Sequence, residues 1–430
     1  MGFKLRSSVI LMKDKDLHLL GDSNLHSFEK MRLISESEFK VLISIDKEVE
    51  LHRDDQINDI IRKWIAEGVI IEETDKYLAS QKIKQLKKVM TAFKKVKPDN
   101  AVIDYHKETI SNAGVQFDFN ETTLSHLYRN KNKALNNLSY GEALCDKLIG
   151  AKESWDSLKI LEIGCGTGLL AKNFLNRLKT DHRNCYEQVE YNLFDLSPAL
   201  QEAQKVSTEG HANKVKLITG NIENYDFEEK FDLIICNEVI ADLNVRVCDK
   251  DLSLCDDQVN ALFNKYDFEI KDFSSKFLLN YQAIKAMEKI TELLKVEGIG
   301  FISEYGSWNE VPQVVELPGH NEYSINFSHL SLVCEQARLL TNFVSMDDFL
   351  NFDKSLSLLD DSARETFSDY FLPFLGHGRL DRIPCEKKAI ESLLGDKFRC
   401  FEKLSFNSLE AGKSTLDPKK FKALILKKTI

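Results

Sequence analysis

Three glycines and a carboxylate at a predicted strand end are the strongest chemical signal in this 430-residue sequence. The apolar run that starts at Lys159 ends in Glu162 and leads into Gly164, Gly166 and Gly168, after which a helical pattern begins. Glycine lets a backbone approach a ligand closely, and the same spacing occurs where dinucleotide enzymes hold a pyrophosphate. Glu162 beside the bend repels a phosphate but favours a cation, such as the sulfonium and amino group of S-adenosylmethionine. We therefore predict an S-adenosylmethionine site here, with S-adenosylhomocysteine as the product.

The next two predicted strand ends carry side chains that fit the rest of an adenosyl group. Asp195, followed by Leu196, ends the second apolar run about thirty residues after the glycines, where a carboxylate can accept hydrogen bonds from both ribose hydroxyls. Asn221 and Ile222 follow the third run, and their amide and apolar side chain suit an adenine. Each is also an ordinary loop residue by itself, so it is their joint occurrence that favours a nucleoside site.

The fourth and fifth predicted strand ends face the side where a methyl acceptor would bind. Ligands of open α/β sheets bind at the carboxyl ends of the strands, which places Glu238 and the pair Glu304 and Tyr305 at the cleft. An amine or alcohol acceptor must lose a proton, for which Glu238 and His329 are candidate bases, whereas a carboxylate acceptor needs only orientation. Tyr305 can donate to a carboxylate or orient an amine. A packing role is the alternative for each of these residues.

Four further residues are candidates for substrate binding outside the strand ends. Tyr105 and His106 lie in the segment before the first predicted strand, and Arg379 and Arg382 lie in a long insertion after the fifth. Arginines there can bind a peptide carboxylate or an acidic side chain. Surface ion pairs explain the same arginines equally well.

The elements that position these residues alternate between short apolar runs and helical stretches. This alternation is typical of an α/β fold with a parallel, Rossmann-like sheet. Two strand-like runs near the end of the chain, residues 397–406 and 419–428, are expected to form an antiparallel pair at one sheet edge. The five runs of the predicted parallel sheet are residues 159–164, 189–197, 214–220, 231–238 and 298–306.

The chain is long enough for more than one structural unit. Residues 8–20 indicate a β-hairpin, Ser35 with Glu38 a helix start, and the apolar spacing up to Trp64 a second helix, which together suggest a winged-helix-like module. The expected boundaries are 1–78 for this module, 79–150 for a lysine-rich linker helix and helical cover, 151–306 for the Rossmann-like core, 307–394 for an inserted lid or acceptor-binding region, and 395–430 for the final two strands.

The central segment resembles class I S-adenosylmethionine-dependent methyltransferases through LEIGCGTG, the acidic Asp195 and the strand FDLIICNEVI. The resemblance implies that Glu162 and the three glycines hold the methionine part of the cofactor, with Asn237 beside the sulfonium. It also implies that Asp195 holds the ribose, and that Asn221 and Ile222 hold the base. It identifies the cofactor and leaves the acceptor open.

Two partial resemblances bear on the acceptor. The segments ICNEVIADLNV, SEYGS and NEYSINFSHLSLVCEQA are similar to MidA-type methyltransferases, some of which modify protein arginine, although Ala241, Asp242 and Asn244 depart from that family's pattern. The segments VILMKDKDLHLLGDSNL, FKVLISIDKEVEL and INDIIRKWIAEGVI, within about 65 residues, resemble PqqD-like peptide-recognition domains of ribosomal-peptide modification enzymes. This second resemblance implies a leader peptide added as a strand to an exposed edge of the module, and a dimerisation or lid domain is the alternative.

Composition restricts the remaining function classes. A net charge of −10 disfavours a nucleic-acid partner, since phosphate binding needs a cationic field. The nine cysteines show neither C-x-x-C pairs nor zinc-like spacing, so we expect no disulfide framework and no metal site. The sequence contains no long apolar stretch, which predicts no membrane partner and a cytoplasmic protein.

The sequence as a whole predicts an enzyme that methylates a peptide or protein, at a carboxylate or nitrogen, in ribosomal-peptide biosynthesis. A small-molecule methyltransferase of secondary metabolism is a second interpretation, in which the N-terminal module forms a homodimer. A third is a non-catalytic assembly factor that binds S-adenosylmethionine without turnover.

Overall fold

The computed structural model divides the chain into two compact units, one comprising Met1–Val96 and Ser355–Ser414, the other Lys97–Lys354 and Thr415–Ile430. This division differs from the expected boundaries, because residues 307–354 belong with the central unit and residues 355–394 do not. The structure describes residues 3–5, 9–14, 17–22, 32–46, 55–66, 70–72, 123–270, 273–317, 320–359, 386–395, 406–409 and 417–429.

The first unit contains the hairpin and the two helices that the sequence predicts. Strands β2 and β3 pair antiparallel from Val9↔Asp22 to Asp14↔Leu17. Ser35 and Glu38 exchange the reciprocal hydrogen bonds of a capping box at the start of the first helix. Trp64 is fully buried among apolar side chains of both helices. The elements are β1 (Phe3–Leu5), β2 (Val9–Asp14), β3 (Leu17–Asp22), β4 (Arg32–Leu33), α1 (Glu36–Asp46), α2 (Asp55–Ala66), β5 (Ile70–Glu72), β17 (Ser357–Leu359), α17 (Lys387–Leu394) and β18 (Phe406–Ser408).

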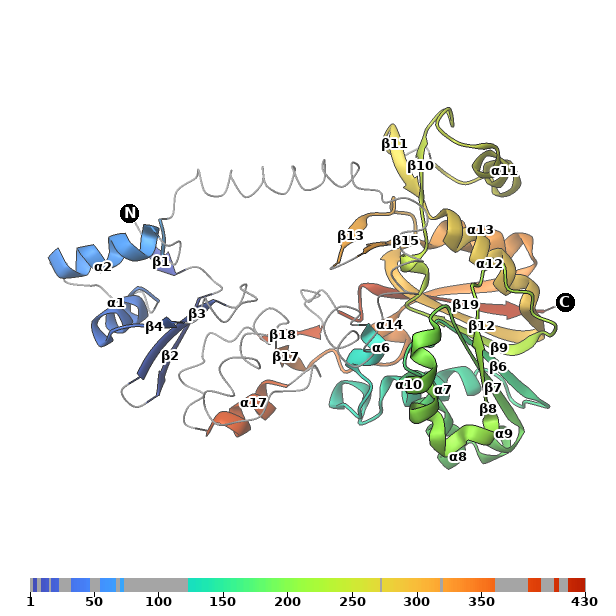
Figure 1. Cartoon of the computed structure of the whole chain (residues 1–430), viewed down its shortest axis with the longest axis horizontal. Helices are drawn as coiled ribbons and strands as arrows, with labels where there is room; N and C mark the ends of the chain where they lie inside the picture. The colour runs from blue at the N-terminus through green and yellow to red at the C-terminus, as the bar shows by residue number, and fades with distance from the viewer. Residues whose placement is uncertain are drawn as a thin grey trace. The chain divides into compact units, whose positions relative to one another are not determined.

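The second unit is built on an eight-stranded sheet in the order β16-β19-β12-β9-β6-β7-β8, with β15 added beside β12 (Figure 1). The five strands from β12 to β8 run parallel, as the sequence predicts, and β19 runs antiparallel between β12 and β16. Its strands are β6 (Leu158–Ile163), β7 (Val189–Asp195), β8 (Val215–Thr219), β9 (Phe231–Asn237), β12 (Leu294–Ser307), β15 (Ile325–Asn326), β16 (Leu339–Ser345) and β19 (Phe421–Lys428).

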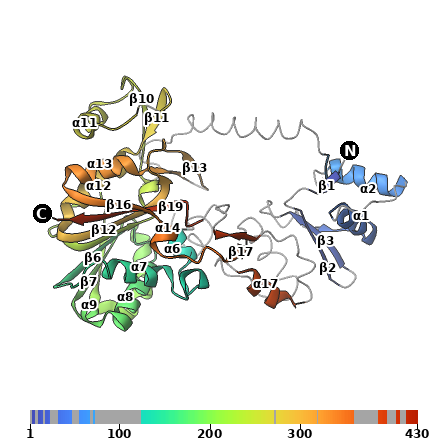
Figure 2. The same cartoon turned by 180° about the vertical axis from the view of Figure 1, so that it is seen from behind.

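Helices cover both faces of this sheet, which makes the fold Rossmann-like and confirms the predicted fold class. Figures 1 and 2 show α12 and α13 on one face and α7 and α8 on the other, and Figure 1 shows α10 beside α8. The helices are α6 (Leu124–Leu127), η3 (Lys133–Leu135), α7 (Tyr140–Ile149), α8 (Leu169–Asp181), α9 (Arg183–Gln188), η4 (Pro198–Leu200), α10 (Gln201–Thr208), η5 (Glu209–Lys214), η6 (Ile240–Asp242), α12 (Tyr281–Leu293), α13 (Phe327–Gln336) and α14 (Met346–Phe349).

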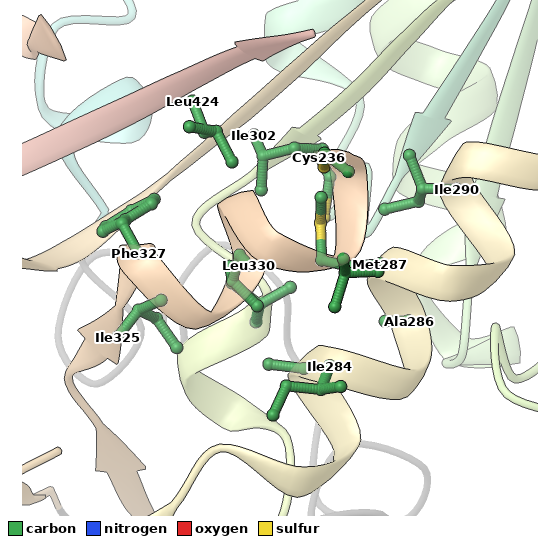
Figure 3. Close-up of a cluster of buried hydrophobic side chains, with 14 of the residues drawn as sticks. Cys236, Ile284, Ala286, Met287, Ile290, Ile302, Ile325, Phe327, Leu330 and Leu424 are labelled. Carbon is green, nitrogen blue, oxygen red and sulfur yellow. The ribbon is translucent and has the colours of Figure 1, made fainter. Parts of the chain in front are cut away.

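The core of the unit lies between the sheet and the helices α12 and α13 (Figure 3). Met287 and Ile290 of α12 and Leu330 of α13 meet Cys236 and Ile302 of the central strands, and all five are at most 1% exposed. Burying each large apolar side chain of this kind contributes roughly 1.5–3 kcal/mol. This packing fixes the strand ends of β9 and β12, which carry the candidate acceptor residues.

The partner of the last strand differs from the sequence expectation. Residues 419–428 form β19 almost as predicted, but this strand pairs with β16, which lies in the segment expected to be a lid. Phe406, at the end of the expected partner run, starts β18 and pairs with Leu359 of β17, while residues 396–405 lie outside the described residues. Antiparallel pairing at this edge is confirmed, whereas the prediction that residues 397–406 form the partner strand was wrong, because β16 occupies that position.

A flap not predicted from the sequence lies between β9 and β12. It consists of the antiparallel strands β10 (Arg246–Asp249) and β11 (Lys276–Leu279) with α11 (Asp257–Tyr266) between them. A second hairpin, β13 (Val314–Glu316) with β14 (Asn321–Tyr323), follows β12 and lies against η6. The flap follows the carboxyl end of β9 and the hairpin follows that of β12, the strand ends at which ligands of this fold class bind.

Candidate functional site

The glycine bend after β6 has the backbone conformation that its sequence predicts. Gly164, Gly166 and Gly168 have φ angles of 69°, 51° and 77°, in the left-handed region that disfavours other residues. A Cβ atom at Gly164 would lie 2.3 Å from a Cγ atom of Val239, so the bend also packs closely against the turn after β9. Gly168 precedes the first residue of α8, whose N-terminal N–H groups therefore open onto the bend.

Asp195, at the end of β7, holds the bend in place. Its carboxylate accepts hydrogen bonds from the N–H groups of Gly166 and Ser197, both at 2.9 Å, and it is 8% exposed. The side chain of Gln204 donates to the carbonyl of Gly166 at 2.9 Å. Asp195, the residue predicted to bind the ribose, therefore lies directly beside the glycines.

Glu162 is a buried acid beside the same bend. It is 3% exposed and accepts a hydrogen bond from the hydroxyl of Tyr191 at 2.6 Å. Burial raises the pKa of Glu162 to about 8, against the lowering effect of Tyr191 and with a further increase from Asp195. A carboxyl group in this environment gains strongly from a cationic ligand, because a cation restores its charged form.

The candidate adenine residues lie at the end of β8. Asn221 accepts a hydrogen bond from the N–H of Glu223 at 3.0 Å, which fixes its amide in a turn. Ile222 is 6% exposed and belongs to the same apolar cluster as Phe194, and Leu196 is half-buried after Asp195. These positions continue the line from Glu162 and Asp195 along neighbouring strand ends.

Asn237, at the end of β9, belongs to a buried polar network. Its side-chain oxygen accepts hydrogen bonds from the hydroxyls of Tyr140 at 2.6 Å and Ser303 at 2.7 Å. Its amide nitrogen donates to Glu238 at 2.9 Å. The network joins α7, β9 and β12, and so fixes the strand end next to the glycine bend.

Glu238 is committed to a structural contact in this conformation. Its carboxylate accepts hydrogen bonds from the backbone N–H groups of Leu124 and Ser125, at the start of α6. Burial raises the pKa of Glu238, while the two backbone bonds oppose that effect. The residue also has a φ of 56°, which is rare for a side chain other than glycine. The carboxylate reaches the helical cover, and it can act as a base only by leaving these two N–H groups.

Glu304 and Tyr305 are the last residues of β12 that pair with β19. The carboxylate of Glu304 accepts from the N–H groups of Ala241 at 3.1 Å and Tyr305 at 2.8 Å. Burial, followed by the charge of Glu322, raises the pKa of Glu304 well above its usual value. Tyr305 is half-buried with its ring 6.1 Å from that of Phe421. Glu304 thus ties the turn after β9 to β12.

His329 lies in the first turn of α13 and is packed among aromatic side chains. It is 1% exposed, and its ring lies 4.4 Å from the ring of Phe268 and 6.0 Å from that of Phe273, measured between centroids. Burial lowers the pKa of His329 to about 4, which keeps the ring neutral at physiological pH. This placement favours packing over proton transfer.

The predicted substrate residues Tyr105, His106, Arg379 and Arg382 lie outside the described residues, as does the predicted lysine-rich helix. Their role stays a prediction. Of the described residues, sequence reasoning missed Tyr140, Tyr191 and Gln204, which contact Asn237, Glu162 and the glycine bend. The position of Tyr191 on β7 was a usable signal. Tyr191 pairs with Ile160 of the neighbouring strand β6 and lies two residues before Leu193, the partner of Glu162.

The comparison with protein families agrees with this geometry. Residues 155–347 match the model of a family described as a methyltransferase domain. The match begins just before β6 and ends in α14, so it covers the glycine bend, all five parallel strands and β16. This part of the chain is therefore similar to methyltransferase domains, which supports the prediction from the sequence.

Two curated relatives are each similar to about a third of the chain. A malonyl-[acyl-carrier protein] O-methyltransferase from Ilyobacter polytropus is 28% identical over 158 residues, which are 35% of this chain and 54% of the relative. A tRNA1(Val) (adenine(37)-N6)-methyltransferase from Haemophilus influenzae is 26% identical over 169 residues, 37% of this chain and 69% of the relative. The chain thus spans about half the length of the first of these relatives.

Two solved structures are similar at lower identity. A structure from Burkholderia thailandensis bound to S-adenosyl-homocysteine is 16% identical, with a TM-score of 0.42, over 69% of this chain and 79% of that one. The N-methyltransferase NodS from Bradyrhizobium japonicum, in complex with S-adenosyl-l-homocysteine, is 15% identical, with a TM-score of 0.29, over 48% and 76%. Among the described residues, no helix combines the length and apolarity needed to cross a bilayer.

Proposed function

We propose that this chain is a methyltransferase that uses S-adenosylmethionine. The observation that carries the proposal is a left-handed glycine bend between two buried carboxylates, Glu162 and Asp195, on neighbouring strands. Two carboxyl groups beside the bend suit a cationic adenosyl ligand, which favours their charged forms, and disfavour a pyrophosphate. The match of residues 155–347 to a methyltransferase domain supports the same interpretation.

The residues present fit the cofactor in charge and in hydrogen-bonding type. Glu162 would hold the amino group, Asp195 the ribose hydroxyls, and Asn221 with Ile222 the adenine, while Asn237 stands at the strand end nearest the sulfonium. The cofactor supplies a methyl group already activated for displacement. What this chain contributes is alignment of the acceptor with that methyl group and exclusion of water.

The surroundings of the two candidate bases, Glu238 and His329, favour a methyl acceptor that needs no strong base. Glu238 is bound to two backbone N–H groups, and His329 is packed between phenylalanine rings. A carboxylate needs only orientation, which Tyr305 can supply. The relative from Ilyobacter polytropus is named for O-methylation of a malonyl group on a carrier protein. We therefore favour a carboxylate carried by a peptide or protein over a nitrogen.

The N-terminal module is the proposed docking element for that peptide. Among the described residues, β2 pairs only with β3, so one side of this six-residue strand is an edge. An extended peptide can add to such an edge through main-chain hydrogen bonds, and a tethered domain then meets it at high effective concentration. The proposed resemblances to MidA-type enzymes and PqqD-like modules are consistent with a peptide acceptor in ribosomal-peptide modification.

Calorimetry on the full chain tests the cofactor. We expect S-adenosylmethionine and S-adenosylhomocysteine to bind, and NAD and ATP not to bind. Asp195→Ala should lose at least about tenfold in affinity, since it removes a charge-assisted bond to each hydroxyl. Asp181→Ala removes an exposed carboxylate at the end of α8 and is the matched control. Binding of NAD or ATP without either adenosyl ligand would refute the proposal.

A labelled-cofactor assay tests the acceptor. Any short peptide encoded next to this gene is a candidate substrate. Transfer to a glutamate or aspartate side chain should give an alkali-labile methyl ester. An alkali-stable product would instead indicate nitrogen. Turnover on a small metabolite with none on peptides would favour a small-molecule methyltransferase, and cofactor binding without any turnover would favour a non-catalytic factor.

A further inference from the structure

Three metal-ligating side chains meet beside the turn that follows β9. Asp242 ends η6, and His320 and Glu322 come from the hairpin β13–β14, about eighty residues further along the chain. One ligand atom from each lies within 4.8 Å of the other two. His320 is 1% exposed, while the side chains of Asp242 and Glu322 are 20% and 30% exposed. The group therefore has a buried imidazole and a partly open carboxylate rim.

The spacing within the group fits a shared cation. Nε2 of His320 lies 3.4 Å from Oδ1 of Asp242 and 3.8 Å from Oε1 of Glu322. Charge-assisted hydrogen bonds between such groups are shorter, at about 2.7–2.9 Å. Two ligands that each lie about 2.1 Å from one tetrahedral ion are about 3.4 Å apart. The separation of His320 and Asp242 matches this value, and the 3.8 Å separation of His320 and Glu322 is somewhat longer, as for a wider angle between the two ligands.

The local charge also favours a cation. The carboxylates of Asp242 and Glu322 beside one imidazole leave an excess of negative charge, and a divalent ion offsets that excess.

We propose that Asp242, His320 and Glu322 bind one divalent transition-metal ion. One imidazole with two carboxylates suits Zn²⁺, Fe²⁺ or Mn²⁺ better than Mg²⁺ or Ca²⁺, which prefer oxygen ligands alone. Three protein ligands leave a coordination position for water or for an oxygen of a bound molecule.

The site adjoins the glycine bend through one short turn. Asp242 donates its N–H to the carbonyl of Val239 at 3.2 Å, and Val239 packs against Gly164. An ion here would polarise an oxygen of the methyl acceptor, a consequence that rests on the proposed function. Metal binding itself does not rest on it, because it can be measured without cofactor or acceptor.

The experiment uses the tag-free full chain, stripped with a chelator and titrated with Zn²⁺ by calorimetry. We expect one ion per chain, a rise in Tm on adding Zn²⁺, and the visible spectrum of tetrahedral Co²⁺ when Co²⁺ replaces it. His320→Ala and Glu322→Gln should each weaken binding by about tenfold or more, since even the loss of an indirect contact costs that much.

Glu316→Gln is the matched control, because it removes one carboxylate from the same hairpin outside the three ligands. Its metal affinity should equal that of the unchanged chain. His320 is buried, so replacing it can unfold the protein. Glu322 is partly exposed, so Glu322→Gln should fold and still tests metal binding in that case. No stoichiometric binding, or binding that Glu322→Gln leaves unchanged, overturns the proposal, whatever the outcome of cofactor titrations.

Discussion

The charge of Glu162 should couple cofactor binding to the release of a proton. In the empty site the pKa of this carboxyl is about 8, because burial penalises its charged form. A ligand with an ammonium group needs the carboxylate and so must displace the proton. Glu162 is ionised in about half of the molecules at pH 8, in about one in eleven at pH 7 and in about one in a hundred at pH 6.

The affinity for S-adenosylhomocysteine should therefore rise by about fifty-fold between pH 6 and pH 8. At pH 7, binding should release about 0.9 protons per ligand, which calorimetry in buffers of different ionisation enthalpy measures directly. 5′-Methylthioadenosine lacks the amino-acid part, so its affinity should stay nearly constant over the same range. This ligand controls for every pH effect that does not involve the ammonium group.

Two variants sharpen the measurement. Glu162→Gln should bind S-adenosylhomocysteine weakly and without the pH dependence. Tyr191→Phe removes the hydrogen bond that lowers the pKa of Glu162, so its profile should move to higher pH while 5′-methylthioadenosine binds unchanged. Equal pH profiles for the two ligands in the unchanged chain, or no proton release at pH 7, would refute the coupling.

Three further predictions concern the elements around the site. Gly164→Ala places a Cβ atom 2.3 Å from Val239 at a φ of 69°, so it should lower the unfolding free energy by roughly 1–3 kcal/mol in chemical denaturation and weaken cofactor binding. The double variant with Val239→Ala should recover part of this stability. A Gly164→Ala variant as stable as the unchanged chain would contradict the packing argument. Glu238→Gln should lower the unfolding free energy by about 1–2 kcal/mol and speed amide exchange at Leu124 and Ser125, whereas loss of turnover at full stability would identify Glu238 as a base. The empty protein should lose stability as the pH rises from about 4.5 to about 8, because folded Glu162 holds its proton while the unfolded carboxyl does not; saturating S-adenosylhomocysteine should reduce this loss, and a flat Tm over that range would count against it.

The sequence by itself determined the parallel strands and the glycine bend. Apolar runs of strand length alternate with helical stretches, and Glu162 and Asp195 stand directly at the ends of two of them. These features depend on side-chain alternation, glycine backbone freedom and position along one strand, all of which are local. For the same reason the capping box of Ser35 and Glu38 was predictable from four consecutive residues.

Only the tertiary structure decided which distant segments meet. The edge strand beside β19 is formed by residues 339–345. The sequence of a strand does not specify which strand it pairs with, because pairing depends on side-chain packing on both faces of the sheet. Glu238 looked like a free carboxylate at a strand end, yet it binds N–H groups 113 and 114 residues earlier in the chain. Asp242 and His320 show no ligand spacing in sequence and stand 3.4 Å apart in space. Contacts of this kind form when helices and hairpins bury their apolar faces against the sheet, and that process brings together polar groups which no local pattern connects.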